Sequence, residues 1–150
     1  MGAGLQAAWV DYDHDGDQDL FLANDFIGPR AEPNFLWRND GVGGFTNVSD
    51  PTSTGLQMHS MGIAIGDPDR DLDLDLAISN IGPTVFLRNQ GGDGFEEDAA
   101  SLGIDRPQQT PGTQAITWGL EFSDLDNDGW EDLVVGAGDH AHVTLPRPAH

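Results

Sequence analysis

Residues 11–19 read Asp11-Tyr12-Asp13-His14-Asp15-Gly16-Asp17-Gln18-Asp19, and this acidic stretch decides the fold because the chain repeats it twice. The further copies are Asp67-Pro68-Asp69-Arg70-Asp71-Leu72-Asp73-Leu74-Asp75 and Asp124-Leu125-Asp126-Asn127-Asp128-Gly129-Trp130-Glu131-Asp132. Aspartate stands at positions 1, 3, 5 and 9 of each copy, and the copies begin 56 and 57 residues apart. A period of this length predicts a repeat architecture.

The spacing within each copy is typical of a loop that binds calcium. Side chains at positions 1, 3 and 5 converge on one point, and position 7 usually offers its backbone carbonyl. Calcium takes six to eight oxygen ligands, so it fits such a loop better than magnesium does. We therefore predict about three Ca²⁺ ions, with these candidate ligands: Asp11, Asp13, Asp15, Asp17, Asp19, Asp67, Asp69, Asp71, Asp73, Asp75, Asp124, Asp126, Asp128, Trp130 and Asp132.

Two observations weigh against a solvated acidic loop without metal. Each loop carries five acidic side chains in nine residues, together 15 of the 26 in the chain, and carboxylates this close repel one another unless a cation neutralises them. The spacing also recurs three times. Glycine at position 6 permits the positive φ of a sharp turn. Gly16 and Gly129 supply it, whereas Leu72 makes the second loop the less regular candidate.

An EF-hand is excluded by the surrounding sequence. An EF-hand needs glutamate at position 12 and flanking helices, whereas position 12 is Leu22, Ile78 or Val135. Short apolar runs precede and follow each loop, as expected of buried strands. The predicted unit is therefore strand, calcium loop, strand.

A second motif completes the repeat. An apolar run ending in Arg38-Asn39 leads through a glycine-rich turn to Phe45, and Arg88-Asn89 leads in the same way to Phe95. This pattern is typical of a β-hairpin. Each repeat thus offers four short antiparallel strands, like the blade of a β-propeller.

The predicted fold class is all-β, with about two and a half propeller-type blades in one domain, residues 1–150. The repeats should cover roughly residues 6–60, 61–115 and 116–145, with a proline-bearing tail at 146–150, and the third stops after its second strand. These blades are too few to close a ring. We therefore expect a fragment of a longer propeller or an open arc.

From about Gln6 to Gly138 the chain resembles the FG-GAP/VCBS repeats of integrin-α-like β-propellers. The similarity is greatest to the ASPIC/UnbV type, the cartilage acidic protein-like family. The resemblance implies that each acidic loop joins the first two strands of a blade and binds calcium. It also implies a role in adhesion or in binding a protein or glycan.

Composition limits the partners of the chain. The formal charge is −20, with 6 basic and 26 acidic residues, which argues against nucleic acid and anionic membranes. The sequence contains no run of 18 apolar residues, so it predicts no membrane-spanning helix. The exposed edges of an open arc favour self-association or association with further blades. Calcium loops of modest affinity need millimolar calcium, so we expect a secreted, periplasmic or cell-surface protein.

Other candidate residues are less specific. His14, at position 4 of its loop, should be exposed and point away from the ion. Trp9, Trp37 and Trp118 fall on predicted strands and should pack in the core. Trp130 should be more exposed and is the best candidate for a partner contact. We expect Arg38 and Arg88 to pair with nearby carboxylates.

The sequence favours a non-catalytic calcium-binding module. No nucleophile-elbow or phosphate-binding motif is present. The alternative is part of a secreted, calcium-dependent enzyme that processes polysaccharides, which would need an acid/base pair outside the loops. A fragment without independent function is a third alternative.

Overall fold

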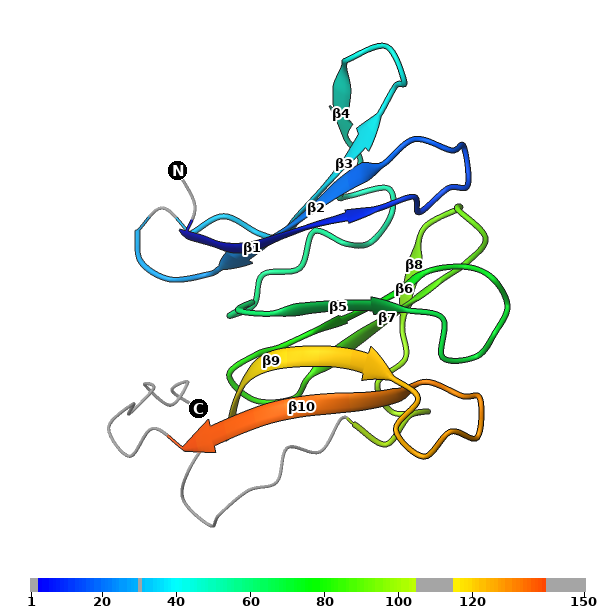
Figure 1. Cartoon of the computed structure of the whole chain (residues 1–150). Coiled ribbons are helices and arrows are strands. Elements are labelled where there is room, and N and C mark those ends of the chain that lie inside the picture. The colour runs from blue at the N-terminus through cyan, green and yellow to red at the C-terminus, as the bar shows by residue number, and fades with distance from the viewer. Residues whose placement is uncertain (1–2, 30, 105–114, 140–150) are drawn as a thin grey trace.

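The computed structural model describes residues 3–29, 31–104 and 115–139, which form β-strands and, within these ranges, no α-helix (Figure 1). The strands are β1 (Ala3–Val10), β2 (Asp19–Asp25), β3 (Phe35–Asn39), β4 (Phe45–Asn47), β5 (Ile63–Gly66), β6 (Asp75–Ile78), β7 (Val85–Asn89), β8 (Phe95–Glu97), β9 (Ala115–Ser123) and β10 (Asp132–Asp139). They form two four-stranded antiparallel sheets, β1-β2-β3-β4 and β5-β6-β7-β8, and a two-stranded sheet of β9 and β10. The predicted all-β fold with blade-like sheets is confirmed, and the described residues form an open arc.

Each acidic loop closes a hairpin at the same register. The paired residues that flank the three loops are Val10 and Asp19, Gly66 and Asp75, and Ser123 and Asp132. We call residues 11–19, 67–75 and 124–132 the first, second and third loops. The predicted order of strand, loop and strand is thus confirmed in all three copies.

The Arg-Asn motif also forms the hairpin that the sequence predicts. Asn39 pairs with Phe45, and Asn89 pairs with Phe95. A backbone hydrogen bond from the residue after each asparagine closes the turn, at 3.0 Å in the first sheet and 2.9 Å in the second. The glycine-rich segments are therefore tight turns between the last two strands of a blade.

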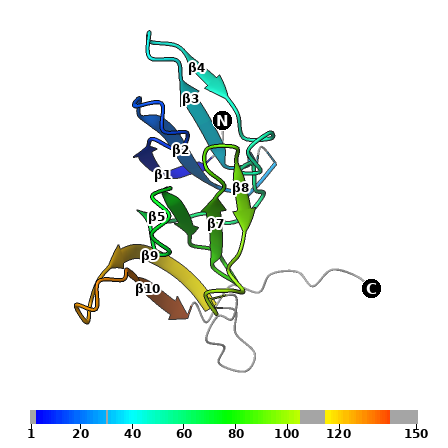
Figure 2. The same cartoon turned by 90° about the vertical axis from the view of Figure 1, so that its right-hand side faces the viewer.

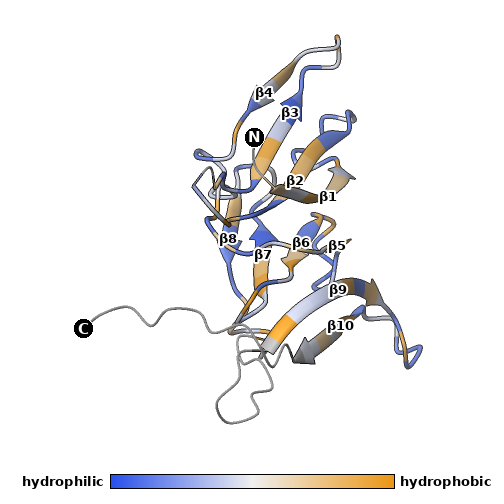
Figure 3. Cartoon of the chain, turned by 90° about the vertical axis from the view of Figure 1, so that its left-hand side faces the viewer, coloured by the Kyte–Doolittle hydropathy of each residue, from blue (hydrophilic) through white to orange (hydrophobic). Residues whose placement is uncertain are grey.

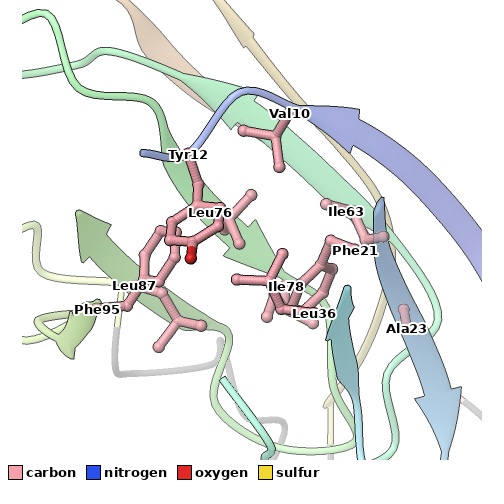
Figure 4. Packing of buried hydrophobic residues seen from close by; sticks show 10 residues of the cluster. All are labelled: Val10, Tyr12, Phe21, Ala23, Leu36, Ile63, Leu76, Ile78, Leu87 and Phe95. Carbon is pink, nitrogen blue, oxygen red and sulfur yellow. The ribbon is translucent and has the colours of Figure 1, made fainter. Parts of the chain in front are cut away.

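The three sheets lie side by side and pack through their faces (Figures 1 and 2). A first apolar cluster joins the first and second sheets (Figure 4): Val10, Tyr12, Phe21, Ala23, Leu36, Ile63, Leu76, Ile78, Leu87 and Phe95. A second cluster joins the second and third sheets, with Ala64, Ala77, Phe86 and Ala99 packed against Leu120, Phe122 and Leu133. Because successive strand residues face opposite sides, the middle sheet is covered on both faces, as in a repeat array.

The tryptophans are more exposed than the sequence suggests. Trp9 is 57% exposed and Trp118 45%, so the prediction that both pack in the core is wrong. The alternation of a strand explains Trp9: its neighbour Val10, 1% exposed, faces the second sheet, so Trp9 faces the other way and contacts Phe45 at a ring distance of 6.3 Å. Trp130, at 49%, is exposed as predicted.

Apolar residues concentrate in the strands, whereas the connecting loops are largely hydrophilic (Figure 3). Among the described residues, no helix is long and apolar enough to cross a membrane. The three acidic loops lie along the same side of the arc, at the right of Figure 1. Their candidate ligands therefore belong to one edge of the molecule. Residues 140–150, including the predicted tail, lie outside the described ranges.

Candidate metal centres

The three loops share one backbone conformation. At position 4, φ is 58°, 61° and 61° for His14, Arg70 and Asn127, and at position 6 it is 90°, 76° and 87° for Gly16, Leu72 and Gly129. Glycine adopts such values freely, whereas a left-handed conformation costs other residues about 1–2 kcal/mol. Leu72 therefore bears a strain that the glycines avoid, yet the second loop keeps the common shape.

Backbone amides hold the carboxylates in place in the same way in each loop. The amide of position 6 donates to the carboxylate of position 1 at 3.2, 3.1 and 2.9 Å in the first, second and third loops. The amide of position 7 donates to the carboxylate of position 5 at 2.9, 2.9 and 2.8 Å. These bonds engage one oxygen of each carboxylate and aim the group at the loop interior.

The carboxylates of positions 1, 3 and 5 converge as predicted. In each loop one oxygen from each of the three lies within 4.8 Å of the others, and the triplets are Asp11, Asp13 and Asp15; Asp67, Asp69 and Asp71; and Asp124, Asp126 and Asp128. Three oxygens at this separation can share one metal ion.

Orphaned oxygens test whether a cation fits these loops. The Oδ1 atoms of Asp11, Asp13 and Asp67 are buried and have no hydrogen-bond partner. An ionised oxygen without a partner is costly to bury. Burial, and next the charge of Asp15, raise the pKa of Asp13 above its ordinary value. An oxygen-coordinated cation would satisfy these atoms and remove the repulsion, so the residues present fit calcium.

The ninth-position aspartates are not among the clustered triplets, and they accept backbone amides that fasten the loops. Asp19, fully buried, accepts the amides of Tyr12 at 3.2 Å and Asn39 at 2.8 Å. Burial raises its pKa, and these two amides oppose the rise. Asp132 accepts the amide of Leu125 at 3.1 Å. Position 9 thus ties the second residue of the loop to its end and, in the first blade, to the third strand.

The second loop lacks one of these fastenings. Proline has no amide hydrogen, and Pro68 stands where Tyr12 and Leu125 donate. Asp75 accepts the amide of Asn89 at 2.7 Å, but its Oδ2 is buried without a partner. Burial raises the pKa of Asp75 to about 7. Of the three ninth-position aspartates, Asp75 is therefore the one with a buried carboxylate oxygen that no hydrogen bond satisfies.

The seventh-position side chains face neighbouring elements rather than the triplets. Asp17 lies against the β3–β4 turn, because a Cβ added to Gly41 would meet its carboxylate. Asp73 Oδ1 lies 3.2 Å from His14 Nε2 of the first loop. The Arg70 guanidinium of the second loop stacks over the Trp130 ring, 4.4 Å from the ring centroid. Position 4 of one loop thus contacts position 7 of the next, a pairing that local spacing did not predict.

The prediction for the arginines is confirmed for Arg88, which pairs with Asp69 and, at 3.0 Å, with Asp98. Arg38 lies close enough to Asp13 to oppose the rise in the pKa of that carboxyl. His14, 47% exposed at its side chain, is at the surface as predicted.

These features define a tandem of blades, each with an acidic loop between its first two strands, and comparison with known proteins finds relatives of the chain. Residues 11–78, from the first loop to the end of β6, match the family described as FG-GAP-like repeat. The resemblance seen in the sequence is therefore confirmed over this segment.

The relatives that the chain matches include cartilage acidic protein 1 of mouse and of human. Identity to the Mus musculus protein is 27% over 157 aligned residues, which cover 99% of this chain and 23% of that protein. Identity to the Homo sapiens protein is 26% over 148 residues, which cover 93% and 22%. The predicted similarity to cartilage acidic protein is confirmed, and the chain spans less than a quarter of the length of these relatives.

Proposed function

We propose that this chain is a calcium-binding, β-propeller-type repeat module without catalytic activity. Each ion would be held between the carboxylates of positions 1, 3 and 5 and would clamp the loop between the first two strands of a blade. The observation that carries the proposal is the triplet geometry, recurring three times, with buried oxygens of Asp11, Asp13 and Asp67 that have no other partner.

The role of the ion in this proposal is structural. A ligand that binds only the folded state adds its binding free energy to the stability of that state. Without a cation, each loop holds five acidic side chains against their mutual repulsion. With a cation, the same side chains fix the end of two strands and the position of the loop against the adjoining blade.

At the level of the whole protein we infer a binding role, in adhesion or in contact with a protein or glycan, outside the cell or at its surface. The three loops, which together carry 15 acidic side chains, lie along one edge of the molecule (Figure 1), and this concentration of charge suits such a contact. Loops of this openness need the millimolar calcium of an extracellular or periplasmic setting. The two relatives, named for acidity and for cartilage, are compatible with that setting.

Two features support a non-catalytic role. Within the described ranges, the carboxylate groups able to hold a metal all lie in the three loops. His59 and Asp25 form an imidazole–carboxylate pair at 2.6 Å elsewhere, but the two residues also form a backbone bridge between β2 and the segment before β5. That placement supports a role in joining blades. Cleavage of a polysaccharide that a change at His59 abolishes would contradict the proposal.

Calcium calorimetry with thermal melts in calcium and in chelator tests the proposal directly. We expect about three bound ions and a higher melting temperature in calcium. Asp13→Asn should weaken the first site roughly tenfold, which equals about 1.4 kcal/mol. Glu96→Gln, on the exposed side of β8, removes an acidic group outside the loops and serves as the matched control. Equal stability with and without calcium, or equal effects of the two substitutions, would refute the structural role.

A further inference from the structure

Arg88 holds a fixed position beside the second loop. It lies on β7, and its Nε and Nη2 both contact Asp98 Oδ2 at 3.0 Å. Its Nη1 contacts the Oδ2 of Asp69, the third-position carboxylate of the loop. The Arg88 side chain is only 26% exposed, and its guanidinium lies 5.8 Å from the centroid of the Phe86 ring. The guanidinium is therefore anchored on one side and bonded to a candidate metal ligand on the other.

The first blade shows what the anchor does. Arg38 occupies the place of Arg88, because both precede the asparagine that ends the third strand. Val48 occupies the place of Asp98: the amides of Val48 and Asp98 donate to equivalent carbonyls of the third strands, each at 2.9 Å. Arg38 thus lacks the carboxylate that holds Arg88, and although its charge acts on Asp13, the Oδ1 of Asp13 has no hydrogen-bond partner.

The third blade has no such cation in its described part. Residues 115–139 contain neither lysine nor arginine. Arg70, from the second loop, stacks on Trp130. The Arg70 guanidinium also lies against Gly129, where it fills the space that a Cβ would need. The position-3 carboxylate of the third loop, Asp126, accepts the backbone amide of Asp128 at 3.1 Å, and none of the ion pairs of the described residues involves it. A guanidinium on the third-position carboxylate therefore distinguishes the second loop from the first and third.

We propose that Arg88, positioned by Asp98, is the internal counter-ion of the second loop, so that this loop takes calcium more weakly than the first and third. A guanidinium bonded to Asp69 neutralises one of the three converging carboxylates and repels an incoming divalent cation. The same bond holds the second loop in shape when no metal is bound. The inference rests on the proposed calcium binding and adds an order in which the loops fill.

A site-resolved titration tests this order on the full chain. The amides of Gly16, Leu72 and Gly129 occupy position 6 of the three loops, and each donates to the first carboxylate of its loop. Their signals in ¹⁵N-resolved NMR spectra report the three sites separately as calcium chloride is added. We expect the Gly16 and Gly129 signals to titrate at lower calcium than the Leu72 signal.

Substitutions separate the effect of Arg88 from that of Leu72. Arg88→Gln should lower the calcium midpoint of the Leu72 signal about tenfold, equivalent to about 1.4 kcal/mol, and leave Gly16 and Gly129 unchanged. Arg38→Gln, the matched change in the first blade, should shift the Gly16 midpoint much less than Arg88→Gln shifts the Leu72 midpoint, because Arg38 acts on Asp13 through its charge alone, and should leave the Leu72 and Gly129 midpoints in place. Asp98→Val gives the second blade the residue that the first blade has, and it should shift the Leu72 midpoint in the same direction. This second variant tests the proposal even if Arg88→Gln does not fold.

The outcomes distinguish this inference from the function on which it rests. If all three amides titrate but Leu72 does so together with the others, or if Arg88→Gln and Asp98→Val leave its midpoint unchanged, the counter-ion role is refuted and calcium binding stands. A higher Leu72 midpoint in Arg88→Gln would show that the guanidinium supports the metal, which also overturns the proposal. If no loop amide responds to calcium, the proposed function and this inference both fail.

Discussion

Replacement of Asn89 by alanine should loosen the contact between the first two blades. The Asn89 side chain is 2% exposed, and its Nδ2 donates to the carbonyls of Tyr12 at 2.8 Å and Leu74 at 3.3 Å. Its Oδ1 accepts the amide of Gly92 at 3.0 Å. One side chain thus fastens the second loop, the β7–β8 turn and the first loop of the adjoining blade.

The magnitude follows from these bonds. A typical hydrogen bond contributes about 1 kcal/mol net, and a buried polar group left without a partner costs about 1–3 kcal/mol. Asn89→Ala removes three bonds, of which the bond to Tyr12 joins two blades. We expect the free energy of unfolding to fall by about 3 kcal/mol, and a chain of this size should then melt about 10 °C lower, from 2–4 °C per kcal/mol.

Asn39→Ala is the matched control, because Asn39 occupies the same place in the first blade. Its side chain bonds Gln18 and Gly41 at 3.2 and 3.1 Å, both bonds are exposed, and both stay within one blade. Its loss should cost about 1 kcal/mol or less. Urea unfolding followed by circular dichroism, in saturating calcium, measures both changes. Equal losses for the two substitutions would refute the assignment of Asn89 as a fastening between blades.

Further predictions concern the loops. Leu72→Gly should raise the free energy of unfolding by up to about 1 kcal/mol, because relief of the left-handed strain exceeds the added flexibility of glycine; a lower stability in urea would contradict this. Since the pKa of Asp75 is about 7 when folded and 3.8 ordinarily, the folded state binds more protons between these values. Stability in chelator should therefore fall as the pH rises from about 4 to 7, by at most about 1.4 kcal/mol per pH unit from this group, and Asp75→Asn should flatten the curve. Arg70→Ala should cost about 0.5–1 kcal/mol and change the fluorescence of Trp130, and an unchanged spectrum would argue against the stacking.

The hairpins and the converging carboxylates are predictable from the sequence because their determinants are local. The spacing of aspartates within nine residues fixes which side chains share the loop interior, and the apolar runs beside each loop fix the strands. Repetition strengthens both signals, since an accidental spacing does not recur with the same flanks. Asn39 and Asn89 were visible as a recurring residue after arginine, although their bonds to the acidic loops were not.

The contacts between blades escape such reasoning because they depend on how sheets stack. His14 and Asp73 are 59 residues apart, and Arg70 and Trp130 are 60 residues apart. Nothing in their local patterns says that position 4 of one loop meets position 7 of the next. The prediction that Trp9 is buried was wrong for the same reason. A strand pattern shows that side chains alternate between two faces, but not which face another sheet covers.

The acidic loops are also where the blades touch one another, and this joins the proposed metal sites to the architecture. The first loop receives Asn89 from the second blade at Tyr12, and a Cβ on Gly92 would lie 2.9 Å from the Cα of Asp13. The third loop contacts the second loop, because Glu131 accepts the amide of Asp67 at 2.9 Å. A cation that orders one loop therefore also orders the surface on which the next blade rests. Removal of calcium should consequently weaken the stacking of the blades as well as the loops themselves.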